Sequence, residues 1–394
     1  MGRPYTRRVG RPAPERRGGL TVRTEEYTAR IDLPAAFEAQ VRSALVDLVV
    51  DDPGPEAAVP VVRVTTERGE PVVSVDGVRW APGPDQSLCD QLIYVLMRAS
   101  LDDAPQRLHL HGGYVARHGH GIVVGGFPRT GKSTLVVRLV ESGFDYFTDE
   151  RVGLGADLDL VPLHKPVSVT QGSFLRLARV DPRVTGRGSA TDRLWHVPAT
   201  AIRPDSLGTI ARPTDVVFLE RAAVAGAEVT EIAPAQMARL LLSDALDARR
   251  AGAEGLERAA RFCASVRCWR LVCDDIEAAV APIERLATLG PRAGARQVEP
   301  LAPAAIPGAT PTALTRAPGV TGVVIDGLVL LRTDAGEIVE LPETLGVWFR
   351  LFDGTLAFDA LVAEVAEAND LPLDVVAPIA REAKATLSAR GLVR

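Results

Sequence analysis

The stretch that most constrains this chain is a glycine-rich loop between a strand and a helix. Residues Gly126-Phe127-Pro128-Arg129-Thr130-Gly131-Lys132-Ser133 fit the pattern G-x-x-x-x-G-K-[ST] of a phosphate-binding loop, or P-loop. The apolar run at 121–126 predicts a strand that enters the loop, and the pattern at 133–143 predicts a helix that leaves it. A strand, loop and helix in this order indicate an α/β domain.

The spacing of this loop has a chemical reason. Glycines let backbone N–H groups turn toward phosphate oxygens, and the N-terminus of the following helix adds partial positive charge. We expect Lys132 to reach the outer phosphates and Ser133 to offer its hydroxyl to Mg²⁺, with Thr134 beside it. Lysine is rare in this arginine-rich chain, which has lysines only at 132, 165 and 384, so each marks a position where arginine does not serve equally well.

A pair of carboxylates follows the predicted helix. The short apolar strand at 145–147 ends in Thr148, Asp149 and Glu150. Two adjacent carboxylates at a strand end beside a phosphate site can act as proton acceptor and as metal ligand. A solvated turn would give the same pattern. Beside a P-loop, the pair favours phosphoryl transfer over nucleotide binding alone.

Composition limits the class of protein. A length of 394 residues predicts two or three domains. The apolar fraction of 46%, the charged fraction of 24% and the net charge of -5 are typical of a soluble globular protein and give no reason to expect nucleic acid or membrane as a partner. We find no membrane-spanning run and no signal-peptide core, so we expect a cytoplasmic protein. The four cysteines lack zinc-site spacing and are expected to be buried thiols.

The sequence divides into four parts. Residues 1–23 predict a disordered basic arm. Residues 24–288 predict one domain, with an N-terminal lobe at 24–107 and a P-loop core at 108–288 in which 234–262 form a long helical stretch. Residues 289–312, dense in Pro, Ala and Gly, predict a flexible linker. Residues 313–394 predict a compact unit of three strands followed by three helices.

The block at 111–154 resembles the catalytic core of the HPr serine kinase group, and the resemblance extends over about 110–225. It implies an α/β fold related to phosphoenolpyruvate carboxykinase, and transfer of phosphate from a nucleotide to a protein serine. It also implies Asp149 as general base, Glu150 as the second acidic residue and metal ligand, and His111 as a supporting catalytic residue. ATP and Mg²⁺ are the implied cofactors, and a homo-oligomer the implied assembly.

The chain departs from this family at two points. The family's acidic pair is Asp-Asp, whereas this chain has Asp149 and Glu150, and the family's second signature has no clear counterpart. Reverse phosphorolysis, and HPr as the substrate, therefore stay open. Related kinase-like proteins have Lys-Pro or Arg-Pro at the position of Lys165, which could contact phosphate or the acceptor, or could be an exposed lysine before a turn.

Two further segments are less specific. The four histidines at 109–120 indicate a turn rather than a metal site, because they lack an acidic or cysteine ligand at ligand spacing. The arginine-rich segment at 176–195 indicates a basic loop that could receive an acidic peptide or a phosphate, or could only be solvated.

The C-terminal unit resembles the PqqD family, an α+β, winged-helix-like unit that recognises the leader segment of ribosomally made peptides. The resemblance implies that the leader adds as a strand to the edge of the small sheet and contacts the last helix. The residues implied are Ile338, Val339, Glu340 and Leu341 on the strand, and Val375, Ile379 and Ala383 on the helix. A DNA-binding winged helix is the alternative, but 313–394 holds 12 acidic residues against 7 basic ones.

Together these features predict an ATP- and Mg²⁺-dependent kinase that phosphorylates a Ser or Thr of a precursor peptide recruited through its leader. A flexible linker would hold that peptide at high effective concentration near the P-loop. A second hypothesis is a nucleotide-binding scaffold that delivers the leader to other tailoring enzymes without transferring phosphate. A third is a nucleotide-sensing transcription factor.

Overall fold

The computed structural model describes residues 17–24, 28–50, 60–67, 69–80, 87–170, 186–187, 194–209, 211–290, 292, 294, 296–302 and 312–394. By its internal contacts the chain forms two compact units. The N-terminal unit comprises Met1–Asp103 with His164–Pro204, and the second unit comprises Ala104–Leu163 with Asp205–Arg394. In the described ranges no helix combines the length and apolar character that a bilayer crossing requires.

The N-terminal unit is built on a sheet with the strand order β3-β1-β2-β4-β5-β6, and a smaller sheet with the order β13-β15-β14. Helix α2 begins with a reciprocal cap, because Ser87 N donates to Asp90 Oδ2 (2.8 Å) and Asp90 N donates to Ser87 Oγ (3.1 Å). Its apolar residues join the strands in one core. The elements are β1 (Arg17–Arg23), β2 (Thr28–Pro34), β3 (Val49–Val50), β4 (Val61–Glu67), β5 (Glu70–Val75), β6 (Val78–Arg79), β13 (Val167–Thr170), β14 (Gly186–Arg187), β15 (Leu194–Val197), α1 (Ala35–Ala44), α2 (Leu88–Asp103) and α5 (Ala199–Ile202).

Two predicted boundaries are corrected in this unit. The predicted basic arm at 1–23 is too long, because Arg17–Arg23 form strand β1, which pairs antiparallel with β2 along its whole length. Leu20 and Val22 of β1 are buried in the core, which the neighbouring arginines and glycines obscure in the sequence. The P-loop core does not extend without interruption over 108–288, since 164–204 group with the N-terminal unit. Most of the arginine-rich segment at 176–195 lies outside the described residues.

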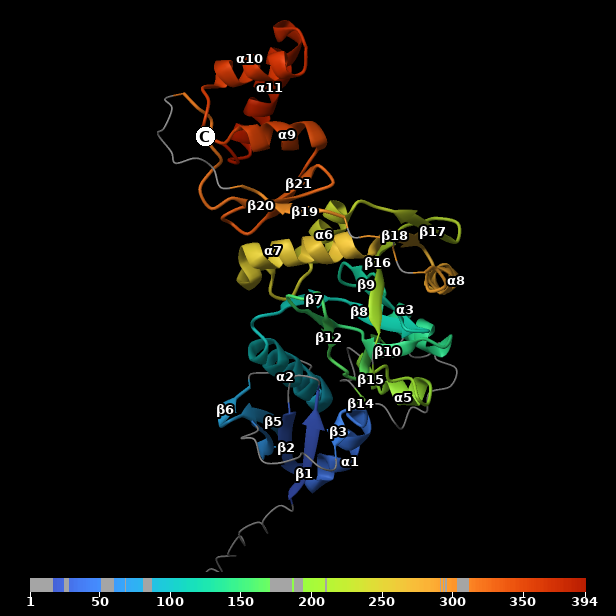
Figure 1. The fold of residues 1–394 in the computed structure, drawn as a ribbon. Helices are drawn as coiled ribbons and strands as arrows, with labels where there is room; N and C mark the ends of the chain where they lie inside the picture. Colours follow the sequence, from blue (N-terminus) through green and yellow to red (C-terminus); the bar gives the residue numbers. More distant parts are fainter. Residues whose placement is uncertain are drawn as a thin grey trace, which may run out of the picture. The chain divides into compact units, whose positions relative to one another are not determined.

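The second unit contains the P-loop core. Its largest sheet has the order β10-β8-β9-β16-β18-β17, with β16 parallel to both β9 and β18. Helix α3 packs against α8, and α6 packs against α7 (Figure 1). A second sheet has the order β12-β11-β7. The elements are β7 (Leu108–His111), β8 (Gly113–Arg117), β9 (His120–Gly126), β10 (Asp145–Thr148), β11 (Arg151–Leu154), β12 (Leu160–Pro162), β16 (Arg212–Arg221), β17 (Ala227–Glu231), β18 (Arg267–Cys273), α3 (Lys132–Glu141), α6 (Pro234–Ser243), α7 (Ala248–Ser265) and α8 (Glu277–Leu286).

The four cysteines are buried free thiols, as predicted. The long helical stretch predicted over 234–262 is not continuous, because the chain leaves the helical conformation at residues 244–247 and again at Gly252. Leu246 N donates to the carbonyl of His109 (2.9 Å), and Asp247 Oδ1 accepts from His109 N (2.9 Å). After the helix ends, the backbone of Leu246 and the side chain of Asp247 therefore both bond the main chain of β7. We call residues 244–247 the interhelical turn.

The C-terminal part is a small sheet followed by three helices, as predicted. The sheet has the order β19-β20-β21-β22, and its side chains alternate between two faces. Val324, Val329 and Leu331 face a core shared with the three helices. The elements are β19 (Val298–Pro300), β20 (Thr321–Ile325), β21 (Leu328–Arg332), β22 (Ile338–Leu341), α9 (Glu343–Leu351), α10 (Phe358–Ala368) and α11 (Leu373–Ala389).

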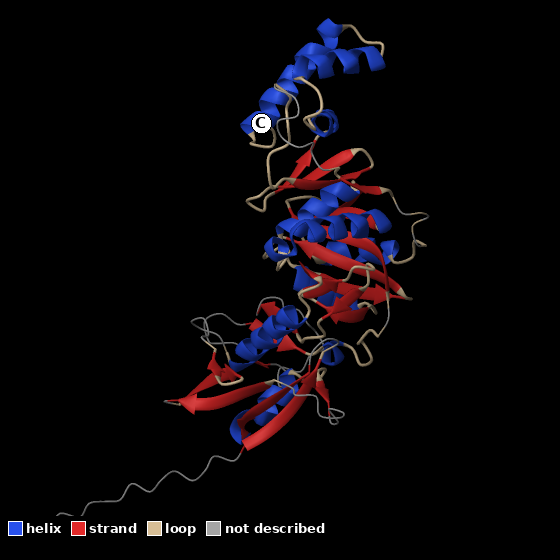
Figure 2. Ribbon diagram, turned by 60° about the vertical axis from the view of Figure 1, so that its left-hand side comes forward, coloured by secondary structure: helices blue, strands red, loops and turns tan. Residues whose placement is uncertain are grey.

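The opposite face of this small sheet packs on the P-loop core. Val323, Ile325 and Leu330 belong to the same apolar cluster as helices α6 and α7, and Figures 1 and 2 show these helices between the large sheet and the small one. Arg239 Nε of α6 also pairs with Glu340 Oε2 of β22 at 3.2 Å. The prediction of a free linker over 289–312 is corrected in part, because Val298–Pro300 form β19 and pair with β20.

This packing gives a stability prediction. Ile325 is fully buried between the small sheet and the core. We expect Ile325→Ala to lower the free energy of unfolding by about 2–4 kcal/mol, because it removes apolar contacts and leaves a cavity. Val347→Ala is the matched control, since Val347 is 45% exposed and its loss is expected to change stability by about 0.5 kcal/mol or less. Urea unfolding measures both. Equal effects would contradict a packed interface.

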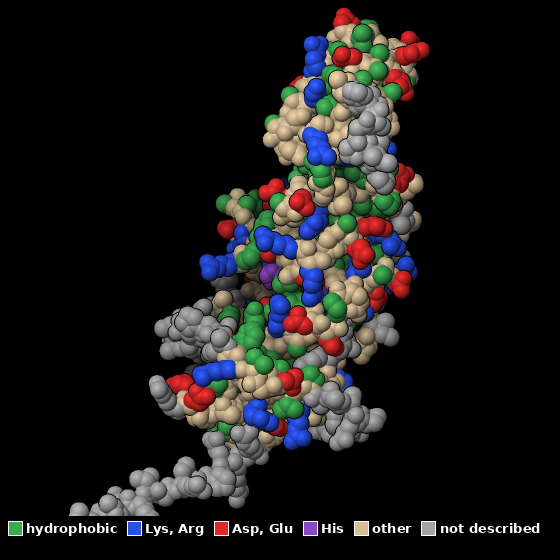
Figure 3. All heavy atoms as spheres, turned by 90° about the vertical axis from the view of Figure 1, so that its left-hand side faces the viewer, with side chains coloured by type: hydrophobic (Ala, Val, Ile, Leu, Met, Phe, Trp, Pro, Cys, Tyr) green, Lys and Arg blue, Asp and Glu red, His purple; other side chains and the backbone are tan. Residues whose placement is uncertain are grey.

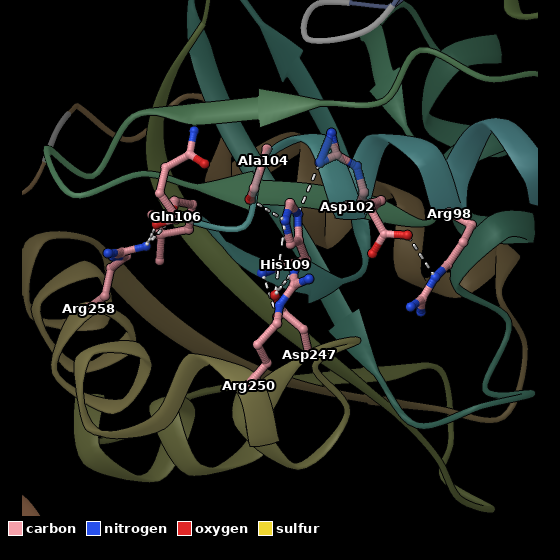
Figure 4. A network of polar contacts seen from close by, with 10 residues as sticks. Arg98, Asp102, Ala104, Gln106, His109, Asp247, Arg250 and Arg258 are labelled. Atoms are coloured by element: carbon pink, nitrogen blue, oxygen red, sulfur yellow. Dashed lines mark hydrogen bonds and ion pairs between the residues drawn. The ribbon is translucent and has the colours of Figure 1, made fainter. Parts of the chain in front are cut away.

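A buried histidine beside the interhelical turn gives a second prediction. Arg151 Nη1 donates to His109 Nδ1 (3.0 Å), so His109 Nε2–H donates to the carbonyl of Ala104 (3.0 Å). Figure 4 shows this ring between Ala104 and Asp247. Burial, together with the Arg151 charge, lowers the pKa of His109 from 6.5 to about 4.

Between these two pH values the unfolded chain binds a proton that the folded protein does not bind. The contribution of His109 to the free energy of unfolding is therefore fully present above about pH 6.5. It falls by about 2–3 kcal/mol as the pH is lowered toward 4. We expect His109→Gln to flatten this part of the profile, whereas His118→Asn, at an exposed histidine, should leave it unchanged. Urea unfolding at a series of pH values measures the slope, and the same slope in His109→Gln would contradict the assignment.

Candidate functional site

The P-loop lies where β9 ends and α3 begins, at the carboxyl end of a central strand. Gly131 has φ of 101°, and a Cβ there would lie 2.9 Å from Ile276 Cδ1. A Cβ at Gly126 would lie 2.7 Å from the carbonyl oxygen of Leu219. Gly126 therefore has no room for a side chain beside β16, and Gly131 has the left-handed backbone that favours glycine. Gly131 directly precedes α3, so the loop ends at a helix N-terminus, where backbone N–H groups can bind an anion.

Lys132 is buried at the start of α3 and folds back over the loop. Its ammonium donates to the carbonyls of Gly126 and Phe127, the latter at 3.3 Å, and pairs with Asp244 Oδ2 at 3.4 Å. Burial lowers the pKa of Lys132, while the charges of Asp244, Glu150 and Asp149 each oppose that shift. These carboxylates are therefore close enough to Lys132 to act on its charge.

The acidic pair lies in the turn between β10 and β11. The carboxylate of Asp149 is buried and accepts from Tyr146 Oη at 3.2 Å. Glu150 N donates to Thr148 Oγ1 (3.3 Å), and its carbonyl accepts from Gly112 N (3.0 Å). These hydrogen bonds hold the turn to Thr148 and to Gly112. The side chain of Asp149 is buried, and Glu150 is partly exposed.

His111 ends strand β7, directly opposite Arg151 in the register with β11. Because Gly112 N bonds the carbonyl of Glu150, His111 lies beside the acidic pair. Its Nδ1 lies 2.8 Å from Asp244 Oδ2. The structure thus brings together Lys132, Asp149, Glu150 and His111, four of the residues named from the sequence, although their catalytic roles stay predictions.

Asp244 is the site residue that sequence reasoning missed. It caps the end of α6, and its Oδ2 contacts both Lys132 and His111. No motif contains it, and it lies 112 positions from Lys132 in the chain. The only signal in the sequence was an acidic residue inside a stretch that otherwise read as one helix.

The side chains present fit a magnesium ion that also binds phosphate. Among the described residues, no three His, Cys, Asp or Glu side chains are grouped as a complete metal site. Mg²⁺ in phosphoryl-transfer sites usually takes only one or two carboxylates, with the other ligands from phosphates and water. Ser133 at the P-loop and Glu150 beside it are oxygen ligands of that kind, and the negative charge of Glu150 reaches Lys132.

Lys165 belongs to the N-terminal unit, where it is buried. Its ammonium donates to the carbonyl of Pro166 (3.1 Å) and to Ser168 Oγ (3.2 Å). Ser168 Oγ in turn lies 3.2 Å from His196 Nδ1, and His196 Nε2 lies 2.5 Å from Asp90 Oδ1. The reading of Lys165 as an exposed lysine is wrong, and its contact with phosphate or acceptor stays a prediction.

The residues predicted to hold a leader peptide divide into two groups. Strand β22 is outermost in the described part of its sheet, and Val375 and Ile379 are 48% and 44% exposed on α11. The side chains of Leu341 and Ala383, however, are buried in the core of the unit, so neither side chain can contact a peptide, which corrects that part of the prediction. On the face that Figure 3 presents, acidic and basic side chains are interspersed.

Comparisons with known proteins give limited help. No protein-family model matches the sequence, and no curated protein matches it. Among solved structures, the HPr(Ser) kinase/phosphatase from Coxiella burnetii matches with 10% sequence identity over 45% of this chain and 96% of that chain, at a TM-score of 0.22. At this TM-score the likeness transfers no site residue to this chain.

Proposed function

We propose that this protein is an ATP- and Mg²⁺-dependent kinase that phosphorylates a Ser or Thr of a ribosomally synthesised precursor peptide. The observation that supports this most is that the charges of Asp149 and Glu150 reach the P-loop lysine, while Asp244 contacts both that lysine and His111. Phosphoryl transfer requires a cation on the phosphates, oxygen ligands for a metal and an acceptor for the hydroxyl proton.

Each residue would have a role in phosphoryl transfer that follows from its position. Lys132 would donate to the outer phosphates and stabilise the charge that develops during transfer. Ser133 and Glu150 would hold Mg²⁺, which when bound supplies charge neutralisation between the phosphates. His111 would lie beside the transferred group and support the acidic turn.

Asp149 would accept the proton of the acceptor hydroxyl. Its carboxylate is held in place by Tyr146 Oη and is almost entirely shielded from solvent. A fixed, shielded carboxylate suits this role, because the proton moves only when the hydroxyl lies within hydrogen-bond distance.

The C-terminal part would recruit the peptide. An extended leader could add to the outer edge of β22 and place apolar side chains against Val375 and Ile379. Because this sheet packs on α6 and α7, the docked peptide would lie on the same unit as the P-loop. A long flexible tether would then not be needed.

The test is incubation of the purified protein with labelled ATP, Mg²⁺ and the precursor peptide encoded nearest to its gene. We expect label on the full peptide, and much less label on a peptide that lacks its leader. Label on the leaderless peptide at an equal rate would contradict recruitment. Peptide binding without label, in preparations that bind ATP, would support the scaffold instead.

A further inference from the structure

Asp244 contacts Lys132, the side chain that the proposed function places on the nucleotide phosphates, and also His111. Its Oδ2 lies 2.8 Å from His111 Nδ1 and 3.4 Å from Lys132 Nζ. The side chain is 16% exposed, so solvent screens these contacts only in part. A carboxylate and a phosphate that approach the same ammonium repel each other. Phosphate binding at Lys132 is therefore opposed as long as Asp244 stays in this position.

Asp244 also begins the interhelical turn, which is attached to β7 on one side. Leu246 and Asp247 bond the main chain of His109, as described for the fold. Asp247 Oδ2 in addition accepts from Arg250 Nη2 at 3.1 Å, and Figure 4 shows Asp247 and Arg250 next to His109. The attachment to β7 is thus made by the last two residues of the turn, and Asp244 is the residue that points to the phosphate site.

The same turn forms one wall of a cavity of about 670 Å³. Ala245, Leu246 and Asp247 line it from the turn, and Arg239, Leu242 and Arg249 line it from the two helices. The facing wall is Gly336–Val339, which includes the first residues of edge strand β22. An edge strand presents backbone N–H and C=O groups outward, so a cavity along it fits an extended peptide.

We propose that the interhelical turn links the two ligand sites: the phosphate of the nucleotide displaces Asp244, and this displacement changes the cavity beside β22 in which a substrate peptide docks. This inference deepens the proposed function by adding regulation to the same site. By reciprocity, a peptide that holds the turn in its displaced position strengthens nucleotide binding by the same factor.

The first readout is the affinity for a non-hydrolysable ATP analogue with Mg²⁺, measured by calorimetry. Asp244→Asn removes the competing charge and is expected to tighten binding about tenfold. Asp244→Glu keeps the charge and is expected to keep the weaker affinity. Glu228→Gln is the matched control, since it removes one exposed carboxylate of the same unit on β17 and is expected to change nothing.

The second readout is hydrogen exchange of the segments 242–249 and 336–341. In the wild-type protein, the ATP analogue is expected to change exchange in both segments. In Asp244→Asn the displaced arrangement is already populated, so the analogue is expected to change them much less. Neither readout uses a peptide or requires phosphoryl transfer.

Weaker analogue binding in Asp244→Asn would overturn the proposal, because it would make Asp244 a ligand of the nucleotide or its metal. Analogue binding that leaves 336–341 unchanged would also overturn it. Failure of this linkage can be distinguished from failure of the proposed kinase activity. If no peptide is labelled while both readouts respond, the linkage stands and the kinase fails, and if label is transferred without either response, the linkage alone fails.

Discussion

Lys132→Ala is expected to lower the rate of phosphate transfer to the peptide by about a thousandfold, and to weaken nucleotide binding as well. A buried ammonium on the outer phosphates stabilises charge in the transition state more than it would in water, and loss of one such donor costs a factor of this size. The side chain is also buried under its own loop, so a neighbouring cation cannot enter without rearrangement. Transfer is measured with labelled ATP and binding by calorimetry.

Lys384→Ala is the matched control for this variant. Lys384 is one of the few other lysines in the chain and lies over the ring of Phe358 in the C-terminal helices. We expect wild-type rates from it. Lys132→Arg is also expected to lose most activity, because a planar guanidinium does not fit the carbonyls that surround the ammonium. Wild-type transfer by Lys132→Ala would remove the P-loop from the mechanism.

Asp149→Asn is expected to reduce kcat by about a thousandfold while the affinity for the ATP analogue changes little. The amide keeps the shape of the side chain and its contact with Tyr146 Oη, but it does not accept the hydroxyl proton. The loss should therefore fall on kcat rather than on binding. Single-turnover transfer measures the rate, and calorimetry measures the affinity.

Asp157→Asn is the control for loss of one carboxylate, because Asp157 is exposed in the turn between β11 and β12. It is expected to keep wild-type kcat and affinity. If Asp149→Asn instead strongly weakens nucleotide binding and leaves kcat at saturation intact, Asp149 acts as a metal or phosphate contact. The base would then have to be sought elsewhere, first at His111.

The P-loop and the acidic pair could be predicted because each is contiguous in the sequence. A glycine-lysine-serine string between an apolar strand and an amphipathic helix has few other uses, and the carboxylates follow on the adjacent strand. Most elements of the C-terminal part could be predicted for the same reason, since its alternating strands and amphipathic helices are local patterns. The contact of these elements with α6 and α7 could not be predicted. Both faces of the small sheet carry apolar residues, and the sequence does not distinguish the face that packs on α6 and α7 from the face that packs on the C-terminal helices.

Asp244 and the interhelical turn could not be predicted from the sequence, for a different reason. The stretch at 234–262 holds mostly alanine, leucine and arginine, which favour helix throughout. The helix ends because Leu246 and Asp247 bond the main chain of His109. Both bonds join residues far apart in the chain, so local sequence patterns do not predict them. Tertiary contacts therefore override the local helix propensity at the turn that carries Asp244.

Ala383 shows the limit of helical periodicity. The resemblance to the PqqD family implied that Val375, Ile379 and Ala383 share one peptide-binding face of the last helix. At about 100° per residue, position 383 is rotated by about 80° from position 375, which is enough to turn it from the surface to the core. Val375 and Ile379 remain exposed, whereas Ala383 is 2% exposed. A peptide groove on α11 would therefore be short.

The most direct test of the central claim is mass analysis of the precursor peptide after incubation with ATP, Mg²⁺ and the purified protein. We expect one added phosphate on a Ser or Thr of the peptide, formed by the wild-type protein and absent with Lys132→Ala and with Asp149→Asn. A peptide that binds to the protein but keeps its original mass, in preparations shown to bind ATP, would contradict it.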